Sequence, residues 1–198
     1  MTDRPTKQAP ARRAIDRRRI LQGVVAGSVG LKFGPAVAKP DDPRKLPPQT
    51  DDDIVFPSWE HGGHTITVDD VPLGGPPILA YPRDPGTRVA REKSRLNQIL
   101  LVKFTEDEFS DDTRLVATGG IVAYSGVCTH TGCSVTEWDT STRNFLCPCH
   151  ASQFDPRERA KIIGGPASRP LPILPLARAD NALKVAGPFS GKVGPKKK

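Results

Sequence analysis

Short apolar runs, each of four to seven residues, set the pattern of the chain beyond residue 57. The runs are rich in β-branched or aromatic residues and are bounded by Gly, Pro or Asp, which is typical of short strands. They are residues 64–68 (HTITV), 78–81 (ILAY), 98–104 (QILLVKF), 120–125 (GIVAYS), 172–178 (PILPLAR) and 182–187 (ALKVAG). Helical periodicity is limited to single turns at 91–96 or 105–109. The pattern therefore predicts an all-β fold, and the 21 prolines and 18 glycines fit many short segments joined by turns.

The same pattern divides the chain into regions. Residues 39–57 are rich in Pro and Asp and have almost no apolar periodicity, so we expect an extended linker there. Residues 58–187 contain all the predicted strands and form the predicted domain, whose size is usual for a single domain. Residues 188–198 end in GKVGPKKK, which predicts a basic flexible tail.

Residues 1–38 have the layout of an export signal, with arginines at 17–19, a weakly apolar, glycine-rich middle and small residues at 36–38. The order DRRRIL resembles a twin-arginine signal with Arg17 and Arg18 as the pair, which implies export of the folded protein to the periplasm. The alternatives are an uncleaved membrane anchor and an unrelated helix. An anchor needs about 20 mostly apolar residues, and polar residues interrupt this stretch. Membrane association is expected only if the segment remains attached.

The basic character of the chain belongs to its ends. The formal net charge is +7 and the pI is about 9.4, yet residues 1–38 contribute eight Lys/Arg and two Asp, and the last eight residues contribute four lysines. Residues 39–190 hold 17 Lys/Arg against 20 Asp/Glu. Because the predicted domain has no basic face interleaved with aromatic residues, the charge distribution argues against nucleic-acid binding.

All four cysteines lie within 22 consecutive residues, in the fragments CTHTGC (128–133) and CPCH (147–150). Each fragment supplies one Cys and one His at short spacing: Cys128 with His130, and Cys147 with His150. Two tight loops could therefore present two thiolates and two imidazoles to one centre. Such a mixed set suits iron or zinc, and a structural Cys2His2 zinc site fits the same spacing.

Several features count against zinc. Cys133 and Cys149 are left over, one in each fragment, and a closed four-ligand zinc site has little use for them. Residues 164–170 (GGPASRP) form a Pro/Gly segment suited to covering a buried cofactor. A second metal site at His61 and His64, in EHGGHT, is not expected, because two histidines beside a Gly-Gly turn are usually plain loop residues.

The fragments CTHTGC, CPCHASQFD and GGPASRPLP resemble those of Rieske proteins, densely over residues 121–172 and only in outline in the flanking strands. The resemblance implies the Rieske fold, an antiparallel β base domain with an inserted cluster-binding subdomain at about 121–172. It also implies one [2Fe-2S] cluster in which two His replace two Cys on one iron. By position, Cys128 and Cys147 would hold one iron, and His130 and His150 the other.

The resemblance also implies that Cys133 and Cys149 form a disulfide. High-potential members of the cytochrome bc class typically read Cys-Pro-Cys-His-Gly-Ser-x-Tyr, in which the Ser and Tyr hydroxyls hydrogen-bond to cluster or ligand sulfur. In this chain Ser152 is kept, Ala151 replaces the Gly and Phe154 stands where the Tyr would be. Because such hydrogen bonds favour the reduced cluster, the missing hydroxyl implies a lower potential.

The sequence shows no nucleotide-binding glycine pattern, no Ser/His/Asp set and no mononuclear iron triad, so no catalytic residue is assigned. The chain resembles electron-transfer subunits, and the small subunit of arsenite-oxidase-type enzymes fits its compact length and weak signal best. The Rieske subunit of a quinol-oxidising cytochrome bc complex is the alternative, favoured by CPCH and by the linker. The expected partners are a larger subunit, of molybdoenzyme or cytochrome b type, and a c-type cytochrome or similar acceptor.

Overall fold

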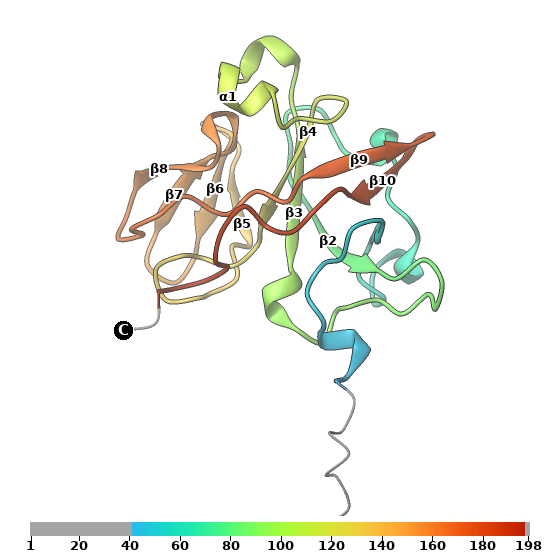
Figure 1. The fold of residues 1–198 in the computed structure, drawn as a ribbon. Helices are drawn as coiled ribbons and strands as arrows, with labels where there is room; N and C mark the ends of the chain where they lie inside the picture. The colour runs from blue at the N-terminus through green and yellow to red at the C-terminus, as the bar shows by residue number, and fades with distance from the viewer. Residues whose placement is uncertain (1–40, 197–198) are drawn as a thin grey trace, which may run out of the picture. The chain divides into compact units, whose positions relative to one another are not determined.

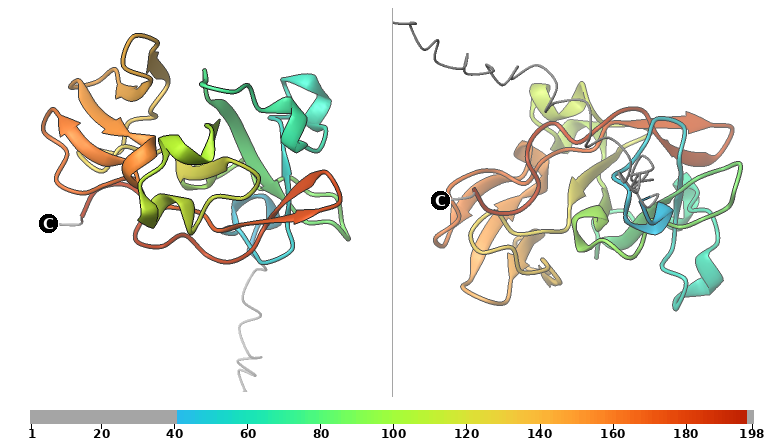
Figure 2. Two further views of the ribbon diagram at one scale, coloured as in Figure 1. Left: turned by 90° about the horizontal axis from the view of Figure 1, so that it is seen from above. Right: turned by 60° about the horizontal axis from the view of Figure 1, so that its bottom comes forward.

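The computed structural model describes residues 41–196, which fold into two antiparallel sheets (Figure 1). The larger sheet has the strand order β4-β3-β2-β1-β10-β9. Its strands are β1 (Asp53–Val55), β2 (Ile78–Arg83), β3 (Ile99–Lys103), β4 (Ile121–Ser125), β9 (Leu176–Ala179) and β10 (Ala182–Val185). The smaller sheet has the order β5-β6-β7-β8 and comprises β5 (Glu137–Asp139), β6 (Asn144–Cys147), β7 (Ser152–Asp155) and β8 (Lys161–Gly164). Figure 2 shows the smaller sheet, in orange, on one side of the domain.

Helix is scarce in the described residues, as the sequence predicts. The α-helix is α1 (Asp111–Arg114), and the 3-10 turns are η2 (Pro43–Lys45), η3 (His61–Gly63), η4 (Val68–Asp70), η5 (Arg95–Asn97), η6 (Glu106–Glu108) and η7 (Pro156–Glu158). The turn expected at 105–109 contains η6, whereas only the last two residues of the turn expected at 91–96 lie in η5. Within residues 41–196, no helix is long and apolar enough to cross a membrane.

Strand β3 is buried on both faces because its side chains alternate between two hydrophobic cores. Ile99 and Leu101 pack into a core formed largely by the larger sheet, whereas Leu100 and Val102 pack into a second core. All four are at most 4% exposed. A strand that is covered on both faces has a continuous run of apolar residues in its sequence, which is why the run ILLV predicted this strand.

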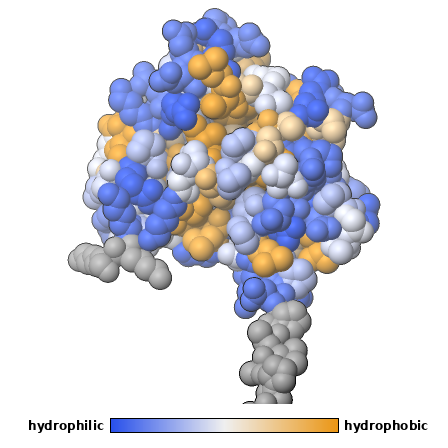
Figure 3. Space-filling model, viewed as in Figure 1, coloured by the Kyte–Doolittle hydropathy of each residue, from blue (hydrophilic) through white to orange (hydrophobic). Residues whose placement is uncertain are grey.

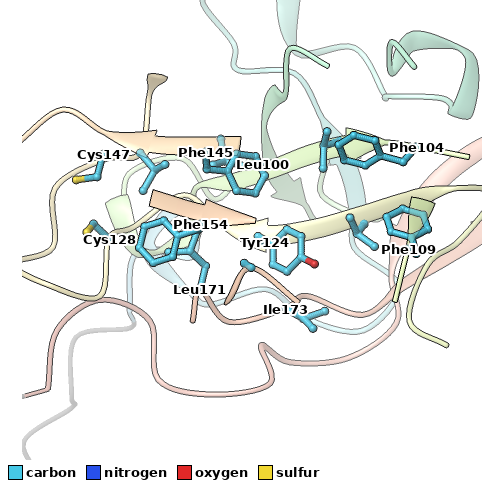
Figure 4. Close-up of a cluster of buried hydrophobic side chains, with 14 residues drawn as sticks. Leu100, Phe104, Phe109, Tyr124, Cys128, Phe145, Cys147, Phe154, Leu171 and Ile173 are labelled. Carbon is cyan, nitrogen blue, oxygen red and sulfur yellow. The ribbon is translucent and has the colours of Figure 1, made fainter. Parts of the chain in front are cut away.

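The second core joins the two sheets and ends at the cysteines (Figure 4). Its buried members are Leu100, Val102, Phe104, Phe109, Val122, Tyr124, Cys128, Val135, Phe145, Cys147, Phe154, Ala160, Leu171 and Ile173. Tyr124, on β4, donates its hydroxyl proton to the Pro156 carbonyl at 2.7 Å, which links the larger sheet to the turn after β7. Desolvation by burial raises the pKa of Tyr124, so this hydroxyl remains protonated as the donor.

The linker predicted at 39–57 is wrong for its described part. Strand β1 lies inside the larger sheet, paired with both β2 and β10. Asp52 and Arg91 are both buried and form an ion pair at 2.7 Å, and Asn97 donates to the Leu46 carbonyl. The domain therefore begins before residue 53. Composition concealed this because a three-residue strand is too short to show periodicity, and the aspartate beside it is neutralised by a distant arginine.

Two predicted strands also differ from the structure. In residues 64–68, Thr65 and Thr67 form isolated bridges, and the chain then turns into η4 through a capping box between Thr67 and Asp70. The run at 172–178 becomes a strand only from Leu176. Proline lacks the N–H that a sheet ladder needs, so the prolines at 172 and 175 delay the strand.

The predicted flexible tail is corrected over its described part, residues 188–196. Phe189 packs against the core of the larger sheet. The Ser190 N–H donates to the Ile173 carbonyl at 2.8 Å, and the Ile173 N–H donates to the Ser190 hydroxyl at 2.9 Å. The tail is therefore attached to the domain by packing and hydrogen bonds. The export signal or anchor predicted at 1–38 lies outside the described residues.

Apolar surface remains exposed on the domain. Figure 3 shows hydrophobic residues along the middle of one face, with hydrophilic residues on both sides. The large apolar side chains that are most exposed in the described chain are Trp59, Leu73, Leu96, Leu115 and Ile163. They come from separate turns and strands, and single exposed apolar residues are normal on soluble domains.

Candidate metal centre

Two tight loops present the predicted ligands. The first loop follows β4, and its Cys128 N–H donates to the Cys133 carbonyl at 2.8 Å while the Gly132 N–H donates back to the Cys128 carbonyl at 3.0 Å. The second loop connects β6 to β7, with Cys147 as the last residue of β6. The Ala151 N–H closes it by donating to the Cys147 carbonyl at 3.0 Å. Both loops are therefore fixed by backbone hydrogen bonds at the ends of strands.

The structure brings the four predicted ligands together, with the thiols inside and the imidazoles outside. Cys128 and Cys147 are free cysteines, each 1% exposed, and their side chains contact each other. The rings of His130 and His150 lie 4.7 Å apart between centroids and nearly perpendicular. His130 is partly buried and His150 is exposed. Solvent or a partner protein thus reaches this site from the histidine side.

One polar atom of the site lacks a hydrogen-bond partner that a metal could replace. Within residues 41–196, the buried Nδ1 of His130 has no hydrogen-bond partner, which is costly for a buried nitrogen. Burial raises the pKa of the Cys147 thiol, and the adjacent Cys128 raises it further, because two neighbouring thiolates repel. The backbone N–H groups of Cys149 and His150 act in the opposite direction. A bound cation would favour the thiolates and satisfy the imidazole.

The spacing of the ligand atoms bears on the kind of centre. Within residues 41–196, one group of three Cys, His, Asp or Glu side chains has all its ligand atoms within 4.8 Å of one another. It consists of Cys133, Cys147 and Cys149. No three of the four predicted ligands meet that limit. A single tetrahedral zinc ion, with bonds of about 2.0–2.3 Å, would hold all four closer together. The donor set and its spacing therefore fit a centre with two metal ions better than a single zinc ion.

A disulfide connects the two loops. Cys133 and Cys149 are bonded, 16 residues apart in sequence, as the family resemblance implies. The bond joins the first loop to the second beside the Cys147 sulfur. It thus holds the loops together independently of any metal.

Replacing both Cys133 and Cys149 with Ser is expected to weaken this connection without removing a predicted ligand. In the chain-entropy model, a bond that closes a loop of about 15 residues stabilises by about 3 kcal/mol. The double variant should therefore bind metal when freshly made but lose it faster on heating, followed as bleaching of its visible absorbance. Dithiothreitol should speed the loss from the parent and leave the variant unchanged. Equal lifetimes in parent and variant would contradict the prediction.

The segment predicted to cover the site reaches both loops. From residues 164–170, the Ala167 N–H donates to the Ser152 hydroxyl at 3.1 Å, and the Arg169 carbonyl accepts from the Thr129 hydroxyl at 2.6 Å. Gly165, with φ of +78°, lies so close to the second loop that a Cβ there would sit 2.4 Å from the Ser152 Cα. The sequence predicted the cover, but the contacts of Thr129, Arg169 and Gly165 carried no local signal.

The two predicted tuning residues are fully buried beside the cysteines. Ser152 accepts a hydrogen bond from Ala167, and no acceptor for its own proton lies among the described residues. Phe154 belongs to the same buried core as Cys128 and Cys147, and Figure 4 shows its ring between Cys128 and Tyr124. Ala151 adopts φ of +55°, a conformation that favours Gly. The effects of Ser152 and Phe154 on a metal centre remain predictions.

His61 and His64 lie elsewhere, at the η3 turn, and both are exposed. His61 packs against the Phe56 ring at 4.6 Å. Within the described residues, no third Cys, His, Asp or Glu side chain lies close enough to form a metal-binding group with these two histidines. The structure thus gives these histidines contacts typical of a surface turn.

The part of the chain that contains the site is similar to known proteins. Residues 89–175 match the family model described as the Rieske [2Fe-2S] domain. A protein of Haloferax mediterranei, whose name provisionally makes it the Rieske subunit of a respiratory nitrate reductase, is 44% identical over 48% of this chain and 44% of its own length. The cytochrome bc1 complex Rieske iron-sulfur subunit of Streptomyces lividans is 38% identical over 49% of this chain and 58% of its own.

A solved structure titled hyperthermophilic respiratory complex III aligns with 75% of this chain and 82% of its own, with 22% identity and a TM-score of 0.43. This structural similarity is too low to support a conclusion about function. The chain spans about half the length of the curated relatives given above. The similarity therefore concerns the part that contains the two loops and the segment that covers them.

Proposed function

Because residues 89–175 match the family model of the Rieske [2Fe-2S] domain, we propose that this chain carries single electrons between partner proteins outside the cytoplasm. The observation that supports this most strongly is the arrangement of the ligands, with two thiols buried and two imidazoles at the surface. Within residues 41–196, no group of three Cys, His, Asp or Glu ligand atoms lies together away from these loops.

Four residues would hold the cluster: Cys128 and Cys147 on one iron, His130 and His150 on the other. When bound, the cluster supplies a one-electron redox couple, at a higher potential than with four thiolates because imidazole is neutral. The protein supplies the rest. The hydrophobic core covers the two cysteines and would keep water from that side of the cluster, and the backbone N–H groups of Cys149 and His150 lower the pKa of the Cys147 thiol.

The histidine side is the route by which electrons would enter and leave. His150 is exposed and His130 is partly so, whereas the cysteines lie behind them against the hydrophobic core. A partner can therefore approach the ligands closely only from this side. The disulfide and the covering segment restrain both loops, and a site that moves little on gaining an electron transfers it with little reorganisation.

We expect the potential to respond to hydroxyl groups beside the sulfurs. Phe154→Tyr should raise the midpoint potential and Ser152→Ala should lower it, each by about 40 mV if one hydrogen bond differs by about 1 kcal/mol between oxidation states. Voltammetry on parent and variants measures both shifts. Phe109→Tyr, which adds a hydroxyl to the same core away from the cysteines, is the matched control and should leave the midpoint unchanged (Figure 4). An unchanged midpoint for Phe154→Tyr would mean that this side chain does not face a ligand sulfur.

The carrier would serve a larger redox complex in the periplasm, reached by the twin-arginine route. One candidate is an enzyme similar to arsenite oxidase, with a molybdoenzyme as the larger subunit, which the sequence resemblance favours. The other is a cytochrome bc complex, with a cytochrome b type partner and a c-type cytochrome as acceptor. It is favoured by the relatives named as cytochrome bc1 Rieske subunits.

Purification of the chain from its native cells under mild conditions tests this proposal. A molybdenum-containing subunit in the complex would support the first candidate, and a b-type haem subunit the second. N-terminal sequencing of the same material shows whether residues 1–38 are removed. Recovery from the cytoplasm with an intact N-terminus and no redox partner would contradict the proposal.

A further inference from the structure

The C-terminal segment, residues 190–196, is fastened against the first ligand loop. Arg169 donates from Nη1 to the Lys192 carbonyl at 3.1 Å and from Nη2 to the Gly194 carbonyl. Pro195 lies beside Gly132, where an added Cβ would come within 3.1 Å of the Pro195 ring. Figures 1 and 2 show the end of the described chain beside the ligand loops. The segment thus adjoins the end of the domain that carries the histidines.

This fastening gathers positive charge around the ligand loops. Lys192 and Lys196 are exposed on the C-terminal segment. Arg95 donates to the Gly132 carbonyl of the first loop, and Arg169 lies on the covering segment. These four residues are called the rim cations below. The nine ion pairs of the described chain involve none of them, so none of the four forms an ion pair with a carboxylate of residues 41–196.

Acidic residues are almost absent from the segments that surround the histidines. The ligand loops and the covering segment, residues 126–136, 147–154 and 163–170, contain no Asp or Glu. From residue 159 to the end, the sequence has nine Lys/Arg and one acidic residue, Asp180. Residues 41–139, in contrast, have 17 Asp/Glu and nine Lys/Arg. The charge is therefore distributed unevenly along the chain, and its positive part includes the surface that electrons would cross.

We propose that the rim cations form a docking surface for an electron-transfer protein whose own redox group is bordered by Asp and Glu residues. The proposal rests on the proposed function, because it takes the histidines as the electron route. Opposite charges around two exposed redox groups speed association and orient the partners. A protein partner fits better than an anionic membrane, since lipid against the rim would cover the histidines and block the route.

Oxidation of the reduced holoprotein by ferricyanide tests the surface kinetically. Each ferricyanide takes one electron to become ferrocyanide, and the protein is oxidised by one electron. The Lys192→Glu, Lys196→Glu variant keeps the carbonyl groups that Arg169 binds and reverses two rim charges. Lys45→Glu, Arg178→Glu makes the same change in net charge at exposed positions outside these segments. At an ionic strength of about 10 mM, the rim variant should react about tenfold slower than the parent and the control at most about threefold slower.

Two further rate measurements, one at high salt and one with a cationic electron acceptor, test whether the effect is due to the charge of the rim cations. At about 0.5 M salt the three rate constants should converge, because exposed charges are then screened. With tris(phenanthroline)cobalt(III), a trication, the rim variant should react faster than the parent at low salt. Equal slowing of rim variant and control with ferricyanide would overturn the proposal, because net charge alone would then explain the effect.

A binding measurement that needs no electron transfer completes the test. Isothermal titration with poly-L-glutamate should show at least about fivefold weaker binding to the rim variant than to the control. Equal binding to the two would overturn the docking surface. Loss of binding to phosphatidylglycerol vesicles with unchanged poly-L-glutamate binding would instead assign the rim to a membrane. Iron analysis of the same samples separates failure of this proposal from failure of the proposed function.

Discussion

Changing His130 or His150 to Ala should leave the purified protein with at most about a tenth of the parent's iron. Each substitution would remove a nitrogen ligand from the same metal ion, and the two cysteines grouped with Cys147, Cys133 and Cys149, are bonded to each other in a disulfide. The visible absorbance of the cluster should disappear with the iron. Because neither side chain is fully buried, the fold should survive, which far-ultraviolet circular dichroism can check.

His61→Ala and His64→Ala are the matched controls for this result. They remove exposed imidazoles that lie at the η3 turn, so iron content should equal that of the parent. Iron retained at parental levels in both His130→Ala and His150→Ala would contradict the ligand assignment. Iron lost in the His61 and His64 variants would show that a second part of the chain takes part.

Among substitutions that leave the predicted ligands in place, Gly165→Ala should have the largest effect on the free energy of unfolding. Gly165 has φ of +78°, and an added Cβ would meet the Ser152 Cα at 2.4 Å and the Ala151 carbonyl oxygen at 2.5 Å. These are backbone atoms of the second ligand loop, so the covering segment must move away from it. The conformational and packing penalties together should cost about 3 kcal/mol in the free energy of unfolding. Urea denaturation measures that loss, and iron analysis should show less cluster per chain.

Gly191→Ala serves as the control for the same chemical change. A Cβ at that position would meet no atom within 4 Å, and its φ is not positive. Its unfolding midpoint should stay close to that of the parent. Parental stability in Gly165→Ala would mean that the covering segment does not approach the second loop as closely as the structure shows.

The sequence predicted the parts of the fold that local pattern encodes. Strands β2, β3 and β4 follow from apolar runs bounded by turn residues. Strand β1 and the four strands of the smaller sheet were not predicted, because they have only three or four residues each and are bounded by turns. In β7, for example, only Ser152 and Phe154 face inward, and two residues are too few to establish a period of two.

The candidate site was more predictable than the fold around it. Predicted ligand pairs such as Cys128 and His130 are close in sequence because one tight loop must present both, so their spacing is itself a signal. The contacts that restrain the loops join distant residues. Arg169 and Gly194 are 25 positions apart, and the buried pair of Asp52 and Arg91 spans 39. No local pattern indicates such pairs, which is why the domain start and the fastened tail were missed.

The central claim is that Cys128, His130, Cys147 and His150 hold one Rieske cluster, and metal analysis of the full-length protein combined with electron paramagnetic resonance tests it most directly. We predict about two irons and two acid-labile sulfides per chain, with a rhombic signal that appears only after reduction by one electron. Stoichiometric zinc in a colourless protein, with no signal in either state, would contradict the account.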